Sequence, residues 1–250
     1  MEDSIKYNHT ETTHNTSAAN IILPIVFQFM QPQSIIDIGC GTGTWLYAAT
    51  QLGIEDVLGV DGYNVDKSKL LIPDDRFLSH DLRTDFKLNK KFDLAICLEV
   101  GEHLDEKNSD VLIKTIVEHA DTVLFSAAIP FQGGQNHCNE QPIDYWEKKF
   151  HHYGYKFYDV IRPFVWENKN VDWWYAQNSF IVSKLDFTDK IKNIHIPTIK
   201  NVVHPELYNY RIANILHIKE SLHLRESIYD GYLLIRPSRK HLLKLILGLK

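Results

Sequence analysis

The stretch that decides the fold covers residues 34–45 and reads Ser-Ile-Ile-Asp-Ile-Gly-Cys-Gly-Thr-Gly-Thr-Trp. Its first half is rich in isoleucine, the composition of a buried strand. The strand pattern stops at Gly39, Gly41 and Gly43, because glycines turn sharply and let a ligand approach the backbone. Small and apolar residues follow and predict a helix. Strand, glycine loop and helix predict the first half of a mononucleotide-binding unit.

Two features separate this loop from the dinucleotide-binding form. That form, Gly-x-Gly-x-x-Gly, needs its third glycine one residue later, where this chain has Thr44. Asp37 ends the predicted strand, where a buried carboxylate is unfavourable unless a cation or a hydrogen-bond donor meets it. A phosphate would be repelled there and an ammonium group attracted. Both features disfavour a nicotinamide dehydrogenase.

The sequence Asp-Ile-Gly-Cys-Gly-Thr-Gly resembles the first motif of class I methyltransferases that depend on S-adenosylmethionine (SAM). The resemblance implies an α/β fold with a Rossmann-like, doubly wound sheet of seven mostly parallel strands and an antiparallel last strand. It also implies that the loop surrounds the methionine part of SAM. The residues expected to contact it are Asp37, Gly39, Cys40, Gly41 and Gly43.

The composition limits the class of protein. The chain has 250 residues, enough for one large α/β domain with an appendage. Its formal charge of −5 argues against nucleic-acid binding through a broad basic surface. Three widely spaced cysteines form neither a disulfide framework nor a CxxC metal site. With no signal-peptide pattern and no apolar run of membrane-spanning length, we expect a cytoplasmic protein.

The pattern along the chain predicts alternating helices and strands. We expect residues 1–185 to form the SAM-binding domain, in which an N-terminal arm and helix over 1–33 cover the cofactor. Residues 186–250 form a mainly helical C-terminal extension, polar and extended up to 203 and helical over 207–227. The expected helices cover 18–30, 106–119 and 143–153, and the later strands cover 57–60, 76–79, 92–98, 122–128, 155–160 and 178–183.

Acidic residues follow successive predicted strands, and ligands of open α/β sheets bind at the carboxyl ends of strands. Asp61 ends the second strand, about twenty residues after the glycine loop, and is predicted to bind both ribose hydroxyls. By the resemblance, Asp81 accepts the adenine amine; the alternative is that it caps a turn. The cofactor set is completed by Gly62, Leu82, Leu98 and Glu99.

A polar loop over residues 130–141 follows the fifth predicted strand and should overhang the same edge of the sheet. We predict His137 as the general base that removes a proton from a hydroxyl acceptor, with Glu140 as its orienting partner and Glu99 as a third catalytic residue. The alternative is that His137 only hydrogen-bonds the loop together.

A metal site is a second interpretation of the same region. Ubiquinone-pathway O-methyltransferases and small-RNA 2′-hydroxyl methyltransferases carry a similar Glu-x-x-Glu-His…His set and use it to hold a divalent metal. The matching positions are Glu99, Glu102, His103 and His137, whose donors suit Mg²⁺, Mn²⁺ or Zn²⁺. Alternatively, Glu102 caps the following helix and His103 packs under the site.

The run from Gly133 to Trp146, with the later Trp-Trp-Tyr-x-Gln-Asn, resembles a bacterial subgroup of methyltransferases associated with surface-polysaccharide (capsule or lipopolysaccharide) assembly. It departs from that subgroup at Cys138. The aromatic segment 166–175 is predicted to stack on a sugar or to pack in the core. The basic stretch 236–250 is amphipathic, and its alternatives are contact with a membrane surface, with its own domain, or with a second subunit of a homodimer.

We therefore predict a SAM-dependent O-methyltransferase. Its acceptor is a hydroxyl or phosphate-type oxygen of a small molecule or glycan, namely a sugar or sugar-nucleotide precursor of a surface polysaccharide. One alternative is a quinone-type small-molecule O-methyltransferase, and another is a non-catalytic SAM-binding partner of a glycan enzyme.

Overall fold

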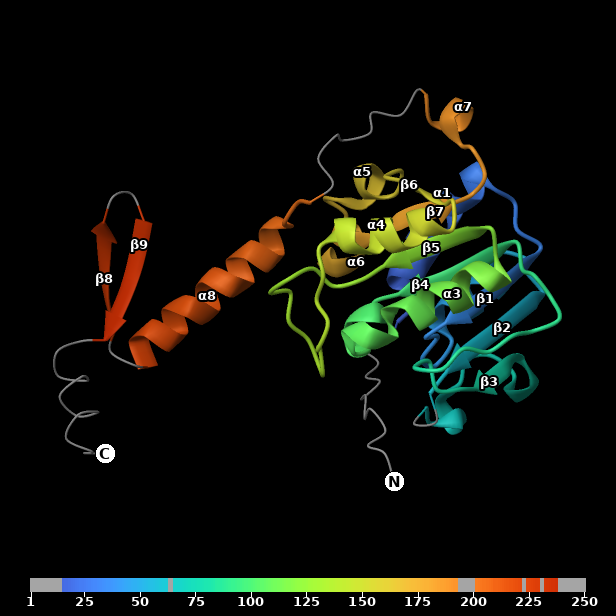
Figure 1. Cartoon of the computed structure of the whole chain (residues 1–250), viewed down its shortest axis with the longest axis horizontal. Helices are drawn as coiled ribbons and strands as arrows, with labels where there is room; N and C mark the ends of the chain where they lie inside the picture. Colours follow the sequence, from blue (N-terminus) through green and yellow to red (C-terminus); the bar gives the residue numbers. More distant parts are fainter. Residues whose placement is uncertain (1–14, 63–64, 193–200, 222–223, 230–231, 238–250) are drawn as a thin grey trace. The chain divides into compact units, whose positions relative to one another are not determined.

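The computed structural model describes residues 15–62, 65–192, 201–221, 224–229 and 232–237 (Figure 1). The chain divides into two compact units, Met1–Val202 and Val203–Lys250. The predicted N-terminal arm up to residue 14 and the basic stretch after residue 237 lie outside the described residues. In the described part of the chain, none of the helices combines the length and the apolar character that a membrane span needs.

The first unit is built on one sheet. Its strands are β1 (Ser34–Ile38), β2 (Asp56–Asp61), β3 (Phe77–Ser79), β4 (Leu94–Leu98), β5 (Thr122–Ser126), β6 (Lys156–Tyr158) and β7 (Phe180–Ser183). They lie in the order β3-β2-β1-β4-β5-β7-β6. Strands β1 to β5 are parallel, and β7 is antiparallel to both of its neighbours. The predicted fold is confirmed. The strand order reverses between β1 and β4, which is where such sheets bind ligands.

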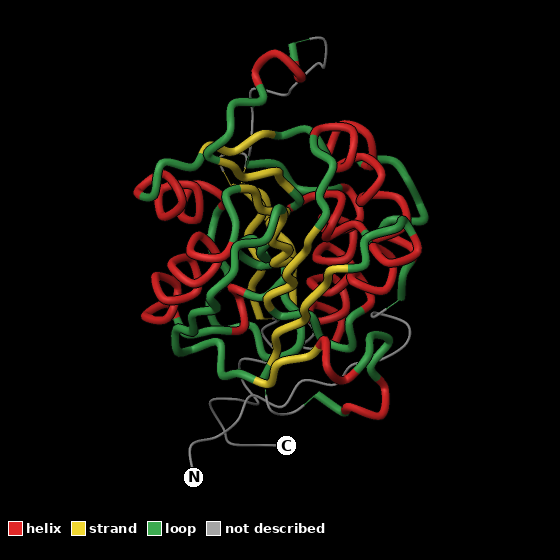
Figure 2. Tube along the Cα trace, turned by 90° about the vertical axis from the view of Figure 1, so that its right-hand side faces the viewer, coloured by secondary structure: helices red, strands yellow, loops and turns green. Residues whose placement is uncertain are grey.

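Helices cover both faces of the sheet (Figure 2). They are α1 (Ser17–Phe29), α2 (Thr44–Gln51), α3 (Ser109–His119), α4 (Ile143–His152), α5 (Arg162–Val165), α6 (Trp173–Asn178) and α7 (Thr188–Ile191). One apolar cluster joins the sheet to α1, α2, α5 and α6. The other joins it to α3 and α4. The central strands β1, β4, β5 and β7 are therefore buried along their whole length.

The two clusters explain why the first strand has isoleucine on both faces. Side chains alternate along a strand, so Ile35 packs in the cluster with α1 and α2, and Ile36 packs in the cluster with α3 and α4. Both are fully buried. Asp37 is the one charged residue of this strand, and it is only 2% exposed. The fold thus places a carboxylate inside the sheet at the start of the glycine loop.

The C-terminal unit differs from the prediction. We expected a helix over 207–227, whereas α8 (Pro205–Ser221) ends earlier and β8 (Leu224–Tyr229) pairs with β9 (Tyr232–Pro237) in an antiparallel hairpin. The sequence between these strands is Asp230-Gly231, a pair that favours two-residue hairpin turns. In the polar segment expected to be extended, α7 forms one short helix. In the first unit, the aromatic insert before β7 also contains two short helices, α5 and α6.

Candidate functional site

The glycine loop connects β1 to α2 through left-handed backbone. Gly39, Gly41 and Gly43 have φ angles of 89°, 53° and 82°, which favour glycine. The amide of Gly39 donates to the Val60 carbonyl of β2 at 2.8 Å, so the loop is held against the neighbouring strand. The helix α2 begins directly after Gly43, at Thr44. The loop therefore has the backbone that the sequence predicted.

Gly39 also packs where no side chain fits. A Cβ atom on Gly39 would lie 2.2 Å from Cγ2 of Val100, which follows β4. Real Cβ atoms are essentially never that close to another heavy atom. The loop is thus pressed against the end of β4, beside the point where the strand order reverses.

Asp37 has a buried carboxyl group. Its Oδ2 atom has no hydrogen-bond partner among the described residues. Burial, and secondly the charge of Asp61, raise the pKa of Asp37 well above its ordinary value. A buried carboxylate is stabilised when a cation meets it. The ammonium group of an amino-acid cofactor such as SAM carries the positive charge that a buried carboxylate attracts.

Asp61, at the end of β2, is joined to the glycine loop. Its Oδ2 atom accepts the Gly41 amide and its Oδ1 atom accepts the Gly62 amide, both at 2.6 Å. The Asp61 carboxylate therefore lies between the carboxyl ends of β1 and β2. An acidic residue at the end of the second strand is the group that binds ribose hydroxyls in nucleotide-binding α/β units.

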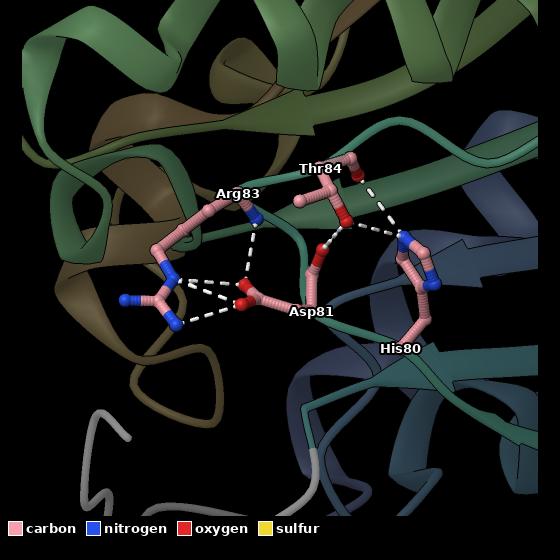
Figure 3. Close-up of polar contacts among 4 residues, drawn as sticks. All are labelled: His80, Asp81, Arg83 and Thr84. Atoms are coloured by element: carbon pink, nitrogen blue, oxygen red, sulfur yellow. Dashed lines mark hydrogen bonds and ion pairs between the residues drawn. The ribbon is translucent and has the colours of Figure 1, made fainter. Parts of the chain in front are cut away.

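Asp81 lies in a braced turn after β3 (Figure 3). Its carboxylate accepts the Arg83 backbone amide at 3.0 Å and forms an ion pair with the Arg83 guanidinium at 2.7 Å. These hydrogen bonds lower the pKa of Asp81. The Thr84 hydroxyl donates to the Asp81 carbonyl, and the His80 ring contacts Thr84. The turn-cap role is therefore present, and an adenine amine would share the carboxylate with Arg83.

Glu99 follows β4 in a strained backbone conformation. Its φ angle is +54°, which is unusual for a residue other than glycine. The carboxylate accepts hydrogen bonds from the side-chain amides of Gln132, at 2.7 Å, and Asn178, at 3.2 Å. Burial raises the pKa of Glu99, and hydrogen bonds from Ser126 and the two amides oppose that rise. Glu99 is thus held by residues that the sequence interpretation did not single out.

Three of the four predicted metal ligands lie together. One donor atom each of Glu102, His103 and His137 lies within 4.8 Å of the others, and the Glu99 carboxylate is outside this group. Glu102 is fully buried, and neither carboxylate oxygen has a hydrogen-bond partner among the described residues. Burial and the charge of Glu99 raise the pKa of Glu102 well above its ordinary value. A buried carboxylate with two orphaned oxygens beside two imidazoles fits a divalent cation.

The remaining features of this cluster match the needs of such a site. Burial, and secondly the charge of His137, lower the pKa of His103 to about 4, so its ring is neutral at pH 7. The neutral imidazole is the form that binds metals. The His103 and His137 rings lie 4.8 Å apart, edge to face.

His137 and Glu140 form the predicted pair. The Nδ1 atom of His137 lies 2.9 Å from the Glu140 carboxylate, which also accepts the Gly133 amide. The loop is anchored further along, where the Asn139 amide group donates to the Gly101 carbonyl and to Ser109. The polar loop therefore has a fixed shape over the end of β4.

The other predicted cofactor residues have plain structural surroundings. Cys40 and Leu98 are buried in the cluster with α1 and α2, and Leu82 packs against the opposite cluster. Burial raises the pKa of the Cys40 thiol well above its ordinary value. A Cβ atom added to Gly62 would have no heavy atom of the described residues within 4 Å, apart from Gly62 itself and its chain neighbours. Asp37, Asp61 and the glycine loop are therefore adjacent, as the sequence predicted.

The strand order and the residues at the strand ends define a Rossmann-like α/β protein with a candidate cofactor site beside β1. A family model described as a methyltransferase domain matches residues 12–180. Because the match covers more than half of the 250 residues, the chain belongs to this methyltransferase-domain family. The family match gives the enzyme class as a methyltransferase.

Solved structures with a similar fold include several methyltransferases. The methyltransferase domain of bacterial CtHen1 is 22% identical, with a TM-score of 0.50 over 68% of this chain and 98% of that chain. The plantazolicin methyltransferase BpumL, solved with S-adenosylhomocysteine (SAH), is 18% identical, with a TM-score of 0.49 over 71% and 87%. Human N-acetylserotonin methyltransferase, solved with SAM, is 13% identical, with a TM-score of 0.48 over 68% and 52%. The chain thus spans about half of the human protein. No curated protein sequence matches the chain significantly.

Proposed function

We propose that the protein transfers the methyl group of SAM to a hydroxyl oxygen of a sugar or sugar-nucleotide precursor of a bacterial surface polysaccharide. The observation that carries the O-methyl part is the His137–Glu140 pair, 2.9 Å apart on the loop after β5. A hydroxyl must lose its proton during methyl transfer, and an oriented imidazole is the usual base. The pair sits in a loop bonded to the backbone of Glu102, at the carboxyl end of the central strands.

The cofactor half of the site would bind three polar groups of SAM, namely its ammonium group, its ribose hydroxyls and its adenine amine. Asp37 would meet the ammonium, with the glycine loop around the methionine chain. Asp61 would accept the ribose hydroxyls, and Asp81, shared with Arg83, would accept the adenine amine. With these roles, the methyl group would face β4 and the loop after β5.

His137 would carry the proton transfer. When Nδ1 donates to Glu140, Nε2 is the unprotonated nitrogen that can accept a proton. The acceptor oxygen then attacks the methyl carbon in line, the carbon–sulfur bond breaks, and its electron pair stays on sulfur to give neutral SAH. The hydroxyl proton goes to His137 Nε2. Positioning supplies roughly 7–11 kcal/mol of such a barrier, and the base adds about 10²–10⁴-fold.

A divalent cation fits beside this base. Glu102, His103 and His137 would hold it, and a bound cation acts as a Lewis acid that lowers the pKa of an acceptor hydroxyl. If His137 is a ligand, its role as base passes to another group, and EDTA distinguishes the two cases. Full activity after EDTA treatment removes the cation from the proposal and keeps His137 as the base.

Aromatic side chains support a sugar acceptor. Tyr175 on α6 packs edge to face with Trp45 at the start of α2, with ring centroids 5.3 Å apart. Trp173 and Trp174 continue this row and are partly exposed. Flat apolar rings of this kind stack on the faces of sugars, but they also bind aromatic rings. A quinone-type phenolic acceptor is therefore the second candidate.

The test is a methyl-transfer assay with SAM across nucleotide-activated sugars and quinol precursors, with products identified by mass spectrometry. We expect a mass increase of one methyl group on a sugar hydroxyl. Methylation of a quinol alone would support the second candidate. SAM binding without transfer to any acceptor, in the presence of a partner glycan enzyme as well as alone, would support a non-catalytic SAM-binding protein.

A further inference from the structure

Two side-chain amides from distant parts of the chain converge on the carboxylate of Glu99. Gln132, in the loop after β5, donates to Oε2 at 2.7 Å. Asn178, the last residue of α6, donates to Oε1 at 3.2 Å. Each carboxylate oxygen thus has its own amide donor, from a different element, so the direction of the Glu99 side chain is fixed at both oxygens.

The two amides are themselves fixed. Gln132 is 4% exposed and Asn178 is 2% exposed, and the Asn178 amide group also donates to the Gln132 carbonyl oxygen at 2.8 Å. Gln177 adds a donor to the Asn178 side chain at 3.0 Å. The Arg162 guanidinium, which is paired with Asp159 in the core, donates to the backbone carbonyl of Gln177 at 3.3 Å. A buried network of this kind leaves its members little rotational freedom.

The network holds a strained residue. Glu99 has a φ angle of +54°, and its amide donates to the Ser126 carbonyl at 3.1 Å. Left-handed backbone in a side-chain-bearing residue persists only where the surroundings over-determine it, and such residues concentrate at functional sites. A structural turn at this position would be met at lower energy by glycine or asparagine.

Glu99 lies at the edge of the sheet where α/β proteins bind their ligands. β4 pairs with β1 on the side where the strand order reverses, with Asp37 opposite Ile96. Glu99 lies three residues beyond Ile96, past the end of the strand and on the ligand-binding edge of the sheet. SAM carries a positive sulfonium that SAH lacks. A carboxylate fixed at this edge would therefore attract the donor more strongly than the product.

We propose that Gln132 and Asn178 are positioning residues, which hold the Glu99 carboxylate toward the sulfonium of bound SAM and so raise the affinity for SAM relative to the affinity for SAH. The proposal rests on the donor named in the proposed function and is independent of the acceptor. The measured quantity is the ratio of the SAH dissociation constant to the SAM dissociation constant. A residue that served only the fold would change both constants together and leave their ratio unchanged.

The experiment uses the full chain with no acceptor and measures both constants by titration calorimetry. We compare the wild type with Asn178→Leu and Gln132→Met, which keep size and remove the donors, and with Glu99→Gln, which removes the charge. Ser179→Ala is the matched control, because Ser179 is equally buried, is next to Asn178, and has a hydroxyl without a hydrogen-bond partner among the described residues. Circular dichroism checks the folding of each variant.

We expect Glu99→Gln to lower the SAM preference at least about fivefold, because it removes a unit charge near a sulfonium. Asn178→Leu and Gln132→Met should lower it in the same direction, and Ser179→Ala should leave it unchanged. In a Glu99→Gln background the amide variants should have no further effect, since they act through that carboxylate.

Three results would overturn the proposal. One is a ratio of SAH to SAM dissociation constants that stays the same in both amide variants. Another is an amide variant that lowers this ratio further when it is combined with Glu99→Gln. The third is a chain that fails to fold when either amide is replaced, which would assign both amides to the fold. Absence of hydroxyl methylation in the separate transfer assay would end the proposed function and leave this binding result standing.

Discussion

Replacing Gly39 by alanine tests the geometry of the glycine loop directly. The new Cβ atom would lie 2.2 Å from Cγ2 and 3.0 Å from Cγ1 of Val100, and the backbone would be strained at φ +89°. Left-handed backbone in alanine destabilises by about 1–2 kcal/mol, and overpacking of a filled site adds about 1–3 kcal/mol. We therefore expect Gly39→Ala to lower the free energy of unfolding by about 2–5 kcal/mol.

Gly53→Ala is the matched control. Gly53 has a nearly identical φ angle of +92°, and nothing lies within 4 Å of the position of its Cβ atom. It should therefore lose only the backbone part, about 1–2 kcal/mol. Because all five tryptophans lie in the first unit, urea unfolding followed by tryptophan fluorescence reports on the part of the chain that contains both glycines.

The same pair separates stability from cofactor binding. To relieve the overlap in Gly39→Ala, either the loop or Val100 must move, so SAH affinity should fall at least about tenfold, whereas Gly53→Ala should bind normally. Adding Val100→Ala removes the two closest atoms and should restore part of both losses. If Gly39→Ala and Gly53→Ala were equal in stability and in SAH affinity, the packing of the loop against β4 would be wrong.

Three further predictions follow from the site. Asp61→Ala should weaken SAH binding roughly 10–100-fold by calorimetry while the far-ultraviolet circular dichroism is retained, and unchanged affinity would mean that the ribose is held elsewhere. His137→Ala should lower kcat by about 10²–10⁴-fold with SAM affinity nearly unchanged, and a variant as active as the wild type would remove its role. Glu102→Gln should stabilise the metal-free protein at pH 8, because burial and the charge of Glu99 raise the pKa of Glu102 and make its charged form costly. Because the pKa of Glu102 is raised in the folded state, the wild type loses stability as the pH rises through that pKa. The stability difference between Glu102→Gln and the wild type should therefore vanish near pH 4. Urea midpoints whose difference does not change with pH would contradict the burial of this carboxyl group.

Local patterns predicted which residues gather at the end of β1 and β2, and their contact with a cofactor stays a prediction. The run of isoleucines, the three glycines and the spacing to Asp61 are all features of neighbouring residues, and the strands place them together because parallel strands end at one edge. The sheet topology was predicted from the resemblance to class I methyltransferases, and the alternation of helix and strand patterns agrees with it. The His137–Glu140 pair was also predictable, because three residues separate its members.

Features that depend on side-chain direction or distant contacts could not be predicted. Asp81 was expected to meet adenine, but its rotamer toward Arg83 follows from the turn and is not visible in the sequence. Gln132 and Asn178 reach Glu99 across 33 and 79 residues, and amides carry no local pattern that marks a convergence of this kind. In the C-terminal unit the helix predicted over 207–227 overlaps the start of β8, and the hairpin of β8 and β9 was not predicted, because strand pairing depends on contacts between two separate segments.

The central claim is that the candidate cofactor site at Asp37 and Asp61 binds an adenosyl amino acid and does not bind a dinucleotide. Titration calorimetry of the full chain with SAH and, separately, with NAD tests it most directly. We predict saturable binding of SAH at a single site and no measurable binding of NAD. Binding of NAD without binding of SAH would contradict the account, because a pyrophosphate would then occupy the place that we assign to an ammonium.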